Sequence, residues 1–325
     1  MRFANFCKIS TILALSACSA GPSVLADDNG TGRVTVSGIS AGGYAAVQAH
    51  VALSSTISGA AVVAAGPYHC AEGNIVYALG RCISGAALEA APLVEATRSA
   101  AGAGTIDPVE SLSNGRVWLF HGEADPIVNV AVTEALRDFY ASFLPEQAIA
   151  LVDTIPATHG WPTRDQGVAC GEMGGDYINA CEYDAAGELL QHLYGSLSQP
   201  TTAREDGLQV LDQAAVVPEG GNFADSGFAY VPQACVDKTG ECRLHLAFHG
   251  CRQGNEFIED RFARMSGLNE WAESNRIIVL YPQVSKSLMN PQGCWDWWGY
   301  TGADYDQRSG KQIAGIAALI EAWSE

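Results

Sequence analysis

A strand-to-helix turn near the start of the chain carries the residue best placed to do chemistry. Gly38-Ile39-Ser40-Ala41-Gly42 is a G-x-S-x-G pentapeptide that follows the apolar run 34–36 and precedes alanine-rich sequence typical of a helix. A serine on so sharp a turn is held exposed, and the amino terminus of the helix favours developing negative charge. This setting predicts that Ser40 is a nucleophile. The alternative is an ordinary Gly/Ser turn.

A serine needs two partners before it can attack at neutral pH. Its hydroxyl requires a base within hydrogen-bond reach, and the base requires an acid that orients it and stabilises its cation. Asp125 is the predicted acid because it lies in a loop after the predicted strand 116–120, and catalytic groups gather at the carboxyl ends of strands in open α/β sheets. Glu123 and Asp153 are rival acids. A turn aspartate before proline is the alternative for Asp125.

His159 is the predicted base. It follows the predicted strand 148–152 in the loop THGWP, and it completes the chain order serine, acid, histidine that α/β-hydrolases use. A loop histidine that bonds a backbone carbonyl is the alternative. Five of the other histidines precede Asp125, share its loop or sit within predicted helices and strands: His50, His69, His121, His192 and His245.

The tetrahedral intermediate of acyl transfer also needs amide donors for its oxyanion. One is expected from the backbone N–H of Ala41, the residue after the nucleophile. The second usually comes from an H-G loop earlier in the chain than the nucleophile. Here the H-G sequence lies within residues 246–252, in the last third of the chain. The parts of the site are therefore complete but occur in a rotated order.

Charge and the first residues narrow the class of protein. The 325 residues carry a net charge of −18, which argues against nucleic acid and anionic membrane surfaces as partners. Residues 1–26 read as a signal peptide, with positive charge at Arg2 and Lys8 and an apolar stretch at 9–17 that is too short to span a membrane. In the alternative reading, a bacterial lipoprotein box, Cys18 carries lipid.

Eight cysteines remain after this leader, and an even number in an exported chain is typical of disulfides. No C-x-x-C pair occurs, so no metal site is predicted, and the chemistry above needs no cofactor. Sequence alone does not choose among the possible pairings. Short separations favour three pairs and leave a fourth: Cys70–Cys82, Cys170–Cys181, Cys235–Cys242 and Cys251–Cys294.

Strand-like and helix-like segments alternate along residues 27–325, which predicts a single α/β domain with a mostly parallel sheet and helices on both faces. Residues 198–223, rich in Pro, Gly, Thr and Asp, read as a connection. The predicted strands are 34–36, 58–65, 116–120, 148–152, 228–231, 243–248 and 276–281. The predicted helices are 41–50, 86–101, 130–143, 187–197, 262–274 and 312–323.

Three segments together resemble one family. VSGISAGGY at 36–44, HGEADPIV at 121–128 and THGWPT at 158–163 are similar to segments of the extracellular poly(3-hydroxybutyrate) depolymerases and the related feruloyl and acetylxylan esterases. In most of that family the H-G-C, Y-P-Q and C-W-x-W segments come before the serine. Here they follow the histidine, at 249–251, 281–283 and 294–297. This order resembles the single-domain fungal type, whose fold is circularly permuted.

The resemblance covers about residues 33–323 and implies a circularly permuted α/β-hydrolase fold. Residues 198–223 would then join the old termini, and the new ends near Asn29 and Glu325 would be spatial neighbours. The implied roles are nucleophile for Ser40, acid for Asp125, base for His159 and oxyanion hole for the amides of Ala41 and Cys251.

Such a protein is expected to be a secreted, monomeric serine esterase that hydrolyses short-chain polyester of the poly(3-hydroxybutyrate) type, without cofactor or partner protein. Since no segment reads as a separate substrate-binding module, aromatic side chains are expected to bind the polymer. The candidates are Trp161, Trp295, Trp297, Trp298 and Tyr300, and packing in the core is the alternative for each. Rival functions are a feruloyl or acetylxylan esterase and a non-catalytic surface binding protein that kept the fold.

Overall fold

An eight-stranded sheet organises the part of the chain that the structure, a computed structural model, describes: residues 34–236 and 242–324. The strands lie across the sheet in the order β4-β3-β2-β1-β10-β11-β9-β8. From β4 to β11 they run parallel, whereas β9 is antiparallel to β11 and β8 to β9. Their bounds are β1 Val34–Ile39, β2 Gly59–Val63, β3 Arg116–Phe120, β4 Ile149–Val152, β8 Leu208–Asp212, β9 Ser226–Tyr230, β10 Arg243–Phe248 and β11 Ile277–Tyr281.

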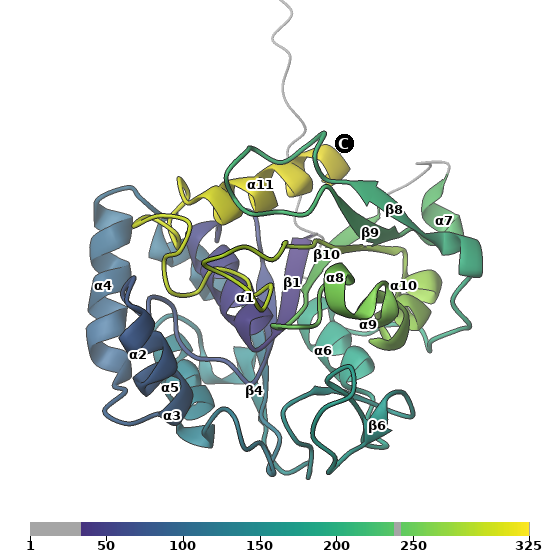
Figure 1. Ribbon diagram of the computed structural model, residues 1–325, viewed down its shortest axis with the longest axis horizontal. Helices are drawn as coiled ribbons and strands as arrows, with labels where there is room; N and C mark the ends of the chain where they lie inside the picture. Colours follow the sequence, from purple (N-terminus) through teal and green to yellow (C-terminus); the bar gives the residue numbers. More distant parts are fainter. Residues whose placement is uncertain (1–33, 237–241, 325) are drawn as a thin grey trace, which may run out of the picture.

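Helices cover both faces of this sheet, which is why β2 can be the unbroken apolar run GAAVV. One apolar core lies under α1, α4, α5 and α11, and a second lies under α6, α9 and α10. In Figure 1, α2–α5 group at one side of the molecule and α8–α10 at the other. The helices are α1 Ala41–Ala52, α2 Ile75–Leu79, α3 Arg81–Ser84, α4 Ala90–Gly102, α5 Val130–Tyr140, α6 Ala185–Tyr194, α7 Gln233–Val236, α8 Asn255–Ile258, α9 Arg261–Met265, α10 Leu268–Asn275 and α11 Lys311–Ser324, with short 3-10 helices η1 Val109–Asn114, η2 Glu146–Ala148 and η3 Glu205–Gly207.

A second, smaller sheet follows β4 in the chain. It consists of β5 Trp161–Thr163, β6 Val168–Ala169 and β7 Ile178–Ala180, in the parallel order β5-β7-β6. A disulfide between Cys170 and Cys181 closes this region. The amide of Thr158 donates to the carbonyl of Cys170 at 3.0 Å, so the small sheet supports the loop that leaves β4.

The predicted strands and helices are found, most with ends shifted by one to three residues, and three segments differ more. The predicted helix 262–274 is two helices, α9 and α10, because Gly267 adopts a φ of 80° between them. The helix α4 begins at Ala90 rather than at residue 86, since Ala87 has a φ of 55°. Residues 198–223, read as a connection, contain η3 and the edge strand β8.

The four disulfides confirm the pairs that the sequence favoured: Cys70–Cys82, Cys170–Cys181, Cys235–Cys242 and Cys251–Cys294. Within residues 34–236 and 242–324, no helix combines the length and apolar character needed to cross a membrane. The predicted signal peptide with Cys18, and both predicted neighbours Asn29 and Glu325, lie outside the described residues.

Candidate active site

Ser40 lies at the end of β1, where the chain turns into α1. Its φ of 55° and ψ of −122° are unusual for a residue with a side chain, and a strained turn of this kind presents a serine at the carboxyl edge of a sheet. The flanking glycines make the turn possible. A Cβ on Gly38 would lie 2.1 Å from the carbonyl oxygen of Gly42, and one on Gly42 would lie 2.3 Å from that of Phe248. The Ser40 amide donates to the carbonyl of Val63 at 2.9 Å, which holds the turn against β2.

Asp125 and His159 are joined by a hydrogen bond. Nδ1 of His159 donates to Oδ2 of Asp125 at 2.7 Å, and both side chains are almost completely buried. The other carboxylate oxygen accepts from the amides of Ile127 and Val128 at 2.8 and 3.0 Å. Burial, the largest influence, raises the pKa of Asp125, but the hydrogen bond and charge of His159 together with the two amides hold that pKa below its usual value. A charged carboxylate on Nδ1 leaves Nε2 as the nitrogen that can accept a proton.

The loops that carry this pair are bonded to each other. The amide of Glu123 donates to the carbonyl of Ile155 at 2.8 Å, and that of Ala124 donates to Ala157 at 3.1 Å. The rival acids play no part in the pair, because within the described residues neither Glu123 nor Asp153 hydrogen-bonds to His159. Adjacent parallel strands, β3 and β4, therefore deliver one acid and one base to the same edge of the sheet.

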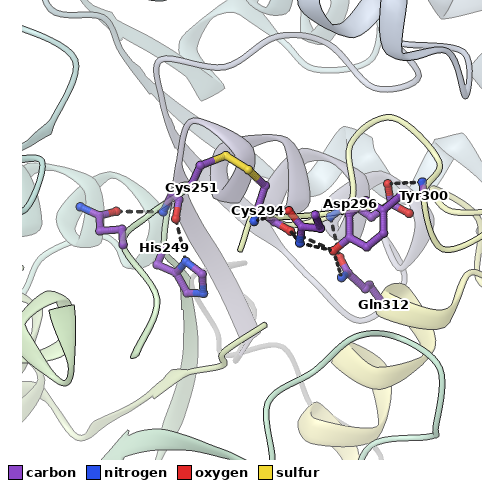
Figure 2. The surroundings of a disulfide bond; sticks show 9 residues. His249, Cys251, Cys294, Asp296, Tyr300 and Gln312 are labelled. Atoms are coloured by element: carbon purple, nitrogen blue, oxygen red, sulfur yellow. Dashed lines mark hydrogen bonds between the residues drawn. A yellow bond between two sulfur atoms is a disulfide. The ribbon is translucent and has the colours of Figure 1, made fainter. Parts of the chain in front are cut away.

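The H-G-C loop of residues 249–251 lies beside the serine turn. Strands β1 and β10 are paired in parallel with Gly38 opposite Phe248, so Ser40 and Gly250, two residues further on, come side by side. A Cβ placed on Gly250 would lie 3.6 Å from the Cβ of Ser40. Figure 2 shows this loop and the disulfide that joins Cys251 to Cys294.

Two backbone amides at this junction are free to bind a ligand as far as the described residues go. Within the described residues, neither the amide of Ala41 nor that of Cys251 donates a hydrogen bond to the backbone or to a side chain. The Ser40 hydroxyl likewise makes no hydrogen bond in this part of the chain. In enzymes without substrate the catalytic hydrogen bonds are often long and tighten only in the complex. The structure thus brings Asp125 to His159, and Ser40 to the H-G-C loop, at one edge of the sheet.

Two of the five predicted substrate-binding aromatic residues are core residues, and their prediction is wrong. Trp161 has no exposed surface, donates from Nε1 to the carbonyl of Ser266 at 2.9 Å and packs edge-on against Phe262. Trp295 is equally buried and packs edge-on against Phe248. A side chain with no accessible surface cannot touch a polymer.

The other three aromatic residues form a continuous wall. Trp297 is largely buried and stacks on Tyr44 with ring centroids 4.7 Å apart. Trp298 contacts Trp297 edge-on and lies 4.9 Å from the ring of Tyr300, and both Trp298 and Tyr300 are half-buried. The hydroxyl of Tyr300 is already bonded to the carbonyl of Cys294 at 2.9 Å. Of this set, Trp298 keeps the most freedom to meet a ligand.

No family model matches the chain. It is 34% identical over 331 residues to the polyhydroxybutyrate depolymerase of Talaromyces funiculosus, a match that covers 97% of this chain and 96% of that protein. The chain belongs to the polyhydroxybutyrate depolymerase family. The poly(3-hydroxybutyrate) depolymerase of Delftia acidovorans is 44% identical over 294 residues, or 89% of this chain, and the chain spans 59% of the length of that relative.

Solved structures of the depolymerase family agree with the fold. The PHB depolymerase from Penicillium funiculosum is 32% identical, with a TM-score of 0.82 over 89% of this chain and 94% of that one. A serine-to-alanine variant of a PHB depolymerase, complexed with an R3HB trimer, gives the same TM-score at 31% identity. The predicted α/β-hydrolase fold, with its mostly parallel sheet, is confirmed.

Several polar residues around this depolymerase-family site were not predicted from the sequence. Gln253 bonds the H-G-C loop, and the buried Asp296 accepts from the amides of 298–301, which shapes the aromatic wall. A second histidine–carboxylate pair joins His69 to Asp306 at 2.6 Å. His69 and Asp306 are 237 positions apart in the sequence, so no local sequence pattern predicts their contact.

Proposed function

We propose that this protein is an exported serine esterase that hydrolyses short-chain polyester of the poly(3-hydroxybutyrate) type. The observation that carries the proposal is the buried Asp125–His159 pair at the same sheet edge as the strained Ser40 turn. A charged carboxylate that orients an imidazole beside a serine is the arrangement that activates a hydroxyl for acyl transfer. Membership of the depolymerase family supports polyester as the substrate.

The reaction follows from the roles of these groups. Nε2 of His159 takes the proton of the Ser40 hydroxyl while its oxygen attacks the ester carbonyl. The resulting oxyanion accepts from the amides of Ala41 and Cys251. His159 then protonates the departing alcohol, which leaves an acyl group on Ser40. A water molecule, deprotonated in turn by His159, releases the hydroxyacid end, so each cycle consumes one water and yields one acid and one alcohol.

A serine substitution tests the nucleophile. Ser40→Ala is expected to abolish hydrolysis of both polymer film and a p-nitrophenyl ester, whereas Ser142→Ala, at an exposed serine in the turn after α5, is expected to leave both rates unchanged. A fluorophosphonate should label wild type at Ser40, located by peptide mass spectrometry. An unlabelled Ser40 would favour a binding protein that kept the hydrolase fold.

Exposed apolar side chains near this edge favour a polymer over a polysaccharide. Leu288 is fully exposed and Met289 nearly so, in the loop after β11, and Val76 and Leu79 project from α2 in the segment after β2. A Cβ on Gly299 would lie 3.2 Å from the Cα of Gly73, so the start of α2 adjoins the aromatic wall. These exposed apolar side chains would bind a polyester surface by apolar contact, but they would form few favourable contacts with a hydrated xylan.

Side-by-side assays separate the two substrate classes. We expect hydrolysis of poly(3-hydroxybutyrate) granules and no release of ferulate or acetate from substituted xylan. The double variant Leu288→Ser/Met289→Ser is expected to lose binding and turnover on granules while its rate on a soluble p-nitrophenyl ester stays within about twofold, since the change adds no buried polar group. Release of ferulate at a comparable rate would move the protein to the carbohydrate esterases.

The proposal extends to the whole chain. Residues 1–26 would direct export and 27–325 would form one catalytic domain that works as a monomer, without cofactor or partner protein. The four disulfides support an oxidising location. The position of β10 next to β1 supports circular permutation, because the H-G-C strand is central in the sheet although it comes late in the chain. Amino-terminal sequencing and mass of the exported protein would distinguish cleavage after 26 from lipid on Cys18.

A further inference from the structure

The H-G-C loop contains two peptide planes whose orientation decides whether Cys251 can serve the oxyanion. They flank Gly250, and a glycine restricts its neighbouring planes less than any other residue. The carbonyl of Gly250 and the N–H of Cys251 belong to one trans peptide. Because that peptide is planar, its carbonyl and N–H point in opposite directions. Whatever fixes the Gly250 carbonyl therefore also aims the Cys251 N–H.

His249 fixes that carbonyl from one side. Its Nδ1 lies 2.8 Å from the carbonyl oxygen of Gly250, and a carbonyl can only accept, so Nδ1 is the donor. The imidazole is completely buried and lies beside the ring of Trp295. Nε2 has no hydrogen-bond partner within the described residues, so Nδ1 makes the imidazole's hydrogen bond. Figure 2 shows the hydrogen bond from the imidazole of His249 to this carbonyl.

Gln253 fixes the preceding plane. Its Oε1 accepts from the amide of Gly250 at 2.8 Å. Its Nε2 donates to the carbonyls of Asp176 and Tyr177, each at 3.0 Å, in the loop before β7. Gln253 is buried as well, and its three side-chain hydrogen bonds hold the H-G-C loop against the small sheet. The disulfide to Cys294 then limits where the Cys251 side chain can move.

The serine turn packs closely against this loop. A Cβ on Gly42 would lie 2.4 Å from the carbonyl oxygen of His249, so the first turn of α1 packs directly against the start of the loop. Gly250 lies beside Ser40 with its carbonyl held by His249, and the Cys251 N–H makes no hydrogen bond to any described residue. A preorganised amide of this kind stabilises charge that develops in the transition state without having to reorient.

We propose that His249 and Gln253 are positioning residues that hold the Cys251 amide in place as the second oxyanion donor. This inference rests on the proposed function, since it assigns a task within the same site. Neither side chain touches the substrate. Both act through the peptide planes of Gly250, and their loss should weaken binding of the transition state while leaving binding of the substrate intact.

Paired substitutions at His249 test the hydrogen bond separately from packing. The Asn side chain places its amide nitrogen at the same bond distance from the backbone as Nδ1 of histidine, whereas Leu fills the space with no donor. With a soluble p-nitrophenyl ester, His249→Leu should lower kcat by about 10- to 100-fold, somewhat less than complete loss of an oxyanion donor, with KM within about threefold. His249→Asn should recover most of kcat although its smaller side chain leaves it less stable than the Leu variant.

Affinity for a boronic acid, which forms a tetrahedral anion on the serine, should fall in His249→Leu by the same factor as kcat. Gln253→Met should lower kcat to a similar extent as His249→Leu, with a similar KM. If His249→Leu does not fold, the result for Gln253→Met tests the inference. The matched control is His50→Leu, an equally buried histidine on α1 whose Nδ1 bonds only the hydroxyl of Tyr140. It should lose stability and keep kcat.

Opposite results overturn the inference. If folded His249→Leu and Gln253→Met keep kcat within twofold of wild type, or if Asn is as poor as Leu, the two residues are packing elements only. Failure of the proposed function gives a different result. In that case wild type itself is not labelled by fluorophosphonate at Ser40 and has no kcat for the variants to lower.

Discussion

The hydrogen bond between Asp125 and His159 predicts how the substitution Asp125→Asn changes kcat. In Asp125→Asn the side chain keeps its shape, and its oxygen still accepts from the amides of Ile127 and Val128, now 2.8 and 3.0 Å from Oδ1. The atom facing Nδ1 of His159, 2.7 Å away, becomes an NH₂ donor. Imidazole must then take the tautomer with its proton on Nε2, and Nε2 can no longer accept the proton of Ser40.

The size of the loss follows from that tautomer. The same change in an unrelated serine protease, where geometry is kept but the tautomer is wrong, lowers kcat by about 10⁴-fold, which corresponds to about 5.4 kcal/mol of transition-state stabilisation. We expect a loss of about 10³- to 10⁴-fold here. Stability should change far less, because both backbone hydrogen bonds are retained and the cost of burying a charge is removed.

The assay is kcat on a soluble p-nitrophenyl ester, with urea unfolding measured alongside. Asp153→Asn is the matched control: it neutralises the rival acid, which is half-buried in the loop after β4 and makes no hydrogen bond to His159 within the described residues. We expect it to keep kcat within about twofold, as for most substitutions away from a site. If Asp125→Asn retains more than a tenth of kcat, or if the control loses as much, Asp125 is not the residue that orients the base.

Three more outcomes follow from the contacts described above. The hydrogen bond to Asp306 raises the pKa of His69 against the effect of burial, with Glu72 and Arg81 as the other charged neighbours. The pair therefore stabilises the fold at pH values below the unfolded pKa of histidine and loses this effect as pH rises through the raised pKa. His69→Gln should lower the free energy of unfolding in urea by about 1 kcal/mol at acidic pH. An equal loss at alkaline pH would contradict this. Gly42→Ala should prevent soluble expression or remove activity, because its Cβ would meet two carbonyl oxygens of the β10 end within 2.4 Å; normal kcat in a stable variant would show that the loop yields. Trp161→Ala should cost about 3–5 kcal/mol of unfolding free energy. The same change at the half-buried Trp298 should cost much less and raise KM for oligomers. Calorimetry and oligomer kinetics measure the two effects, and a larger stability loss in the Trp298 variant than in the Trp161 variant would contradict the assignments.

The strands of the main sheet can be predicted from the sequence because parallel strands that are buried on both faces are unbroken apolar runs. Strand 116–120 was predicted with its observed bounds, and the loops after 116–120 and 148–152 had to meet at one edge, which put Asp125 near His159. The edge strand β8 was missed because it spans only Leu208–Asp212 and Leu211 is its single buried residue, so it shows neither an apolar run nor a regular alternation. Its neighbours Pro, Gly and Thr made the whole segment look like a connection.

Side-chain direction is what the sequence could not supply. Trp161 is two residues from His159, yet in β5 it turns inward against Phe262 instead of facing a ligand. Trp295 and Trp298 are three residues apart in one aromatic run, and only the buried carboxylate of Asp296, through its bonds to the following amides, sends the second toward the surface. The direction of Trp161 depends on contact with the distant Phe262 and that of Trp298 on the burial of Asp296, and neither follows from the periodicity of the local sequence.

The pairing of β1 with β10 divides the active site between two continuous lengths of polypeptide. Residues 34–194 contribute the serine, the acid and the histidine, and residues 208–324 contribute the H-G-C loop. The segment between them is largely exposed. A break there would place the catalytic serine, acid and histidine on one fragment and the Cys251 amide on the other, and it would cut no strand of the main sheet. Two such fragments, inert apart, would report their own reassembly by regaining ester turnover, which makes this fold a natural starting point for a complementation reporter.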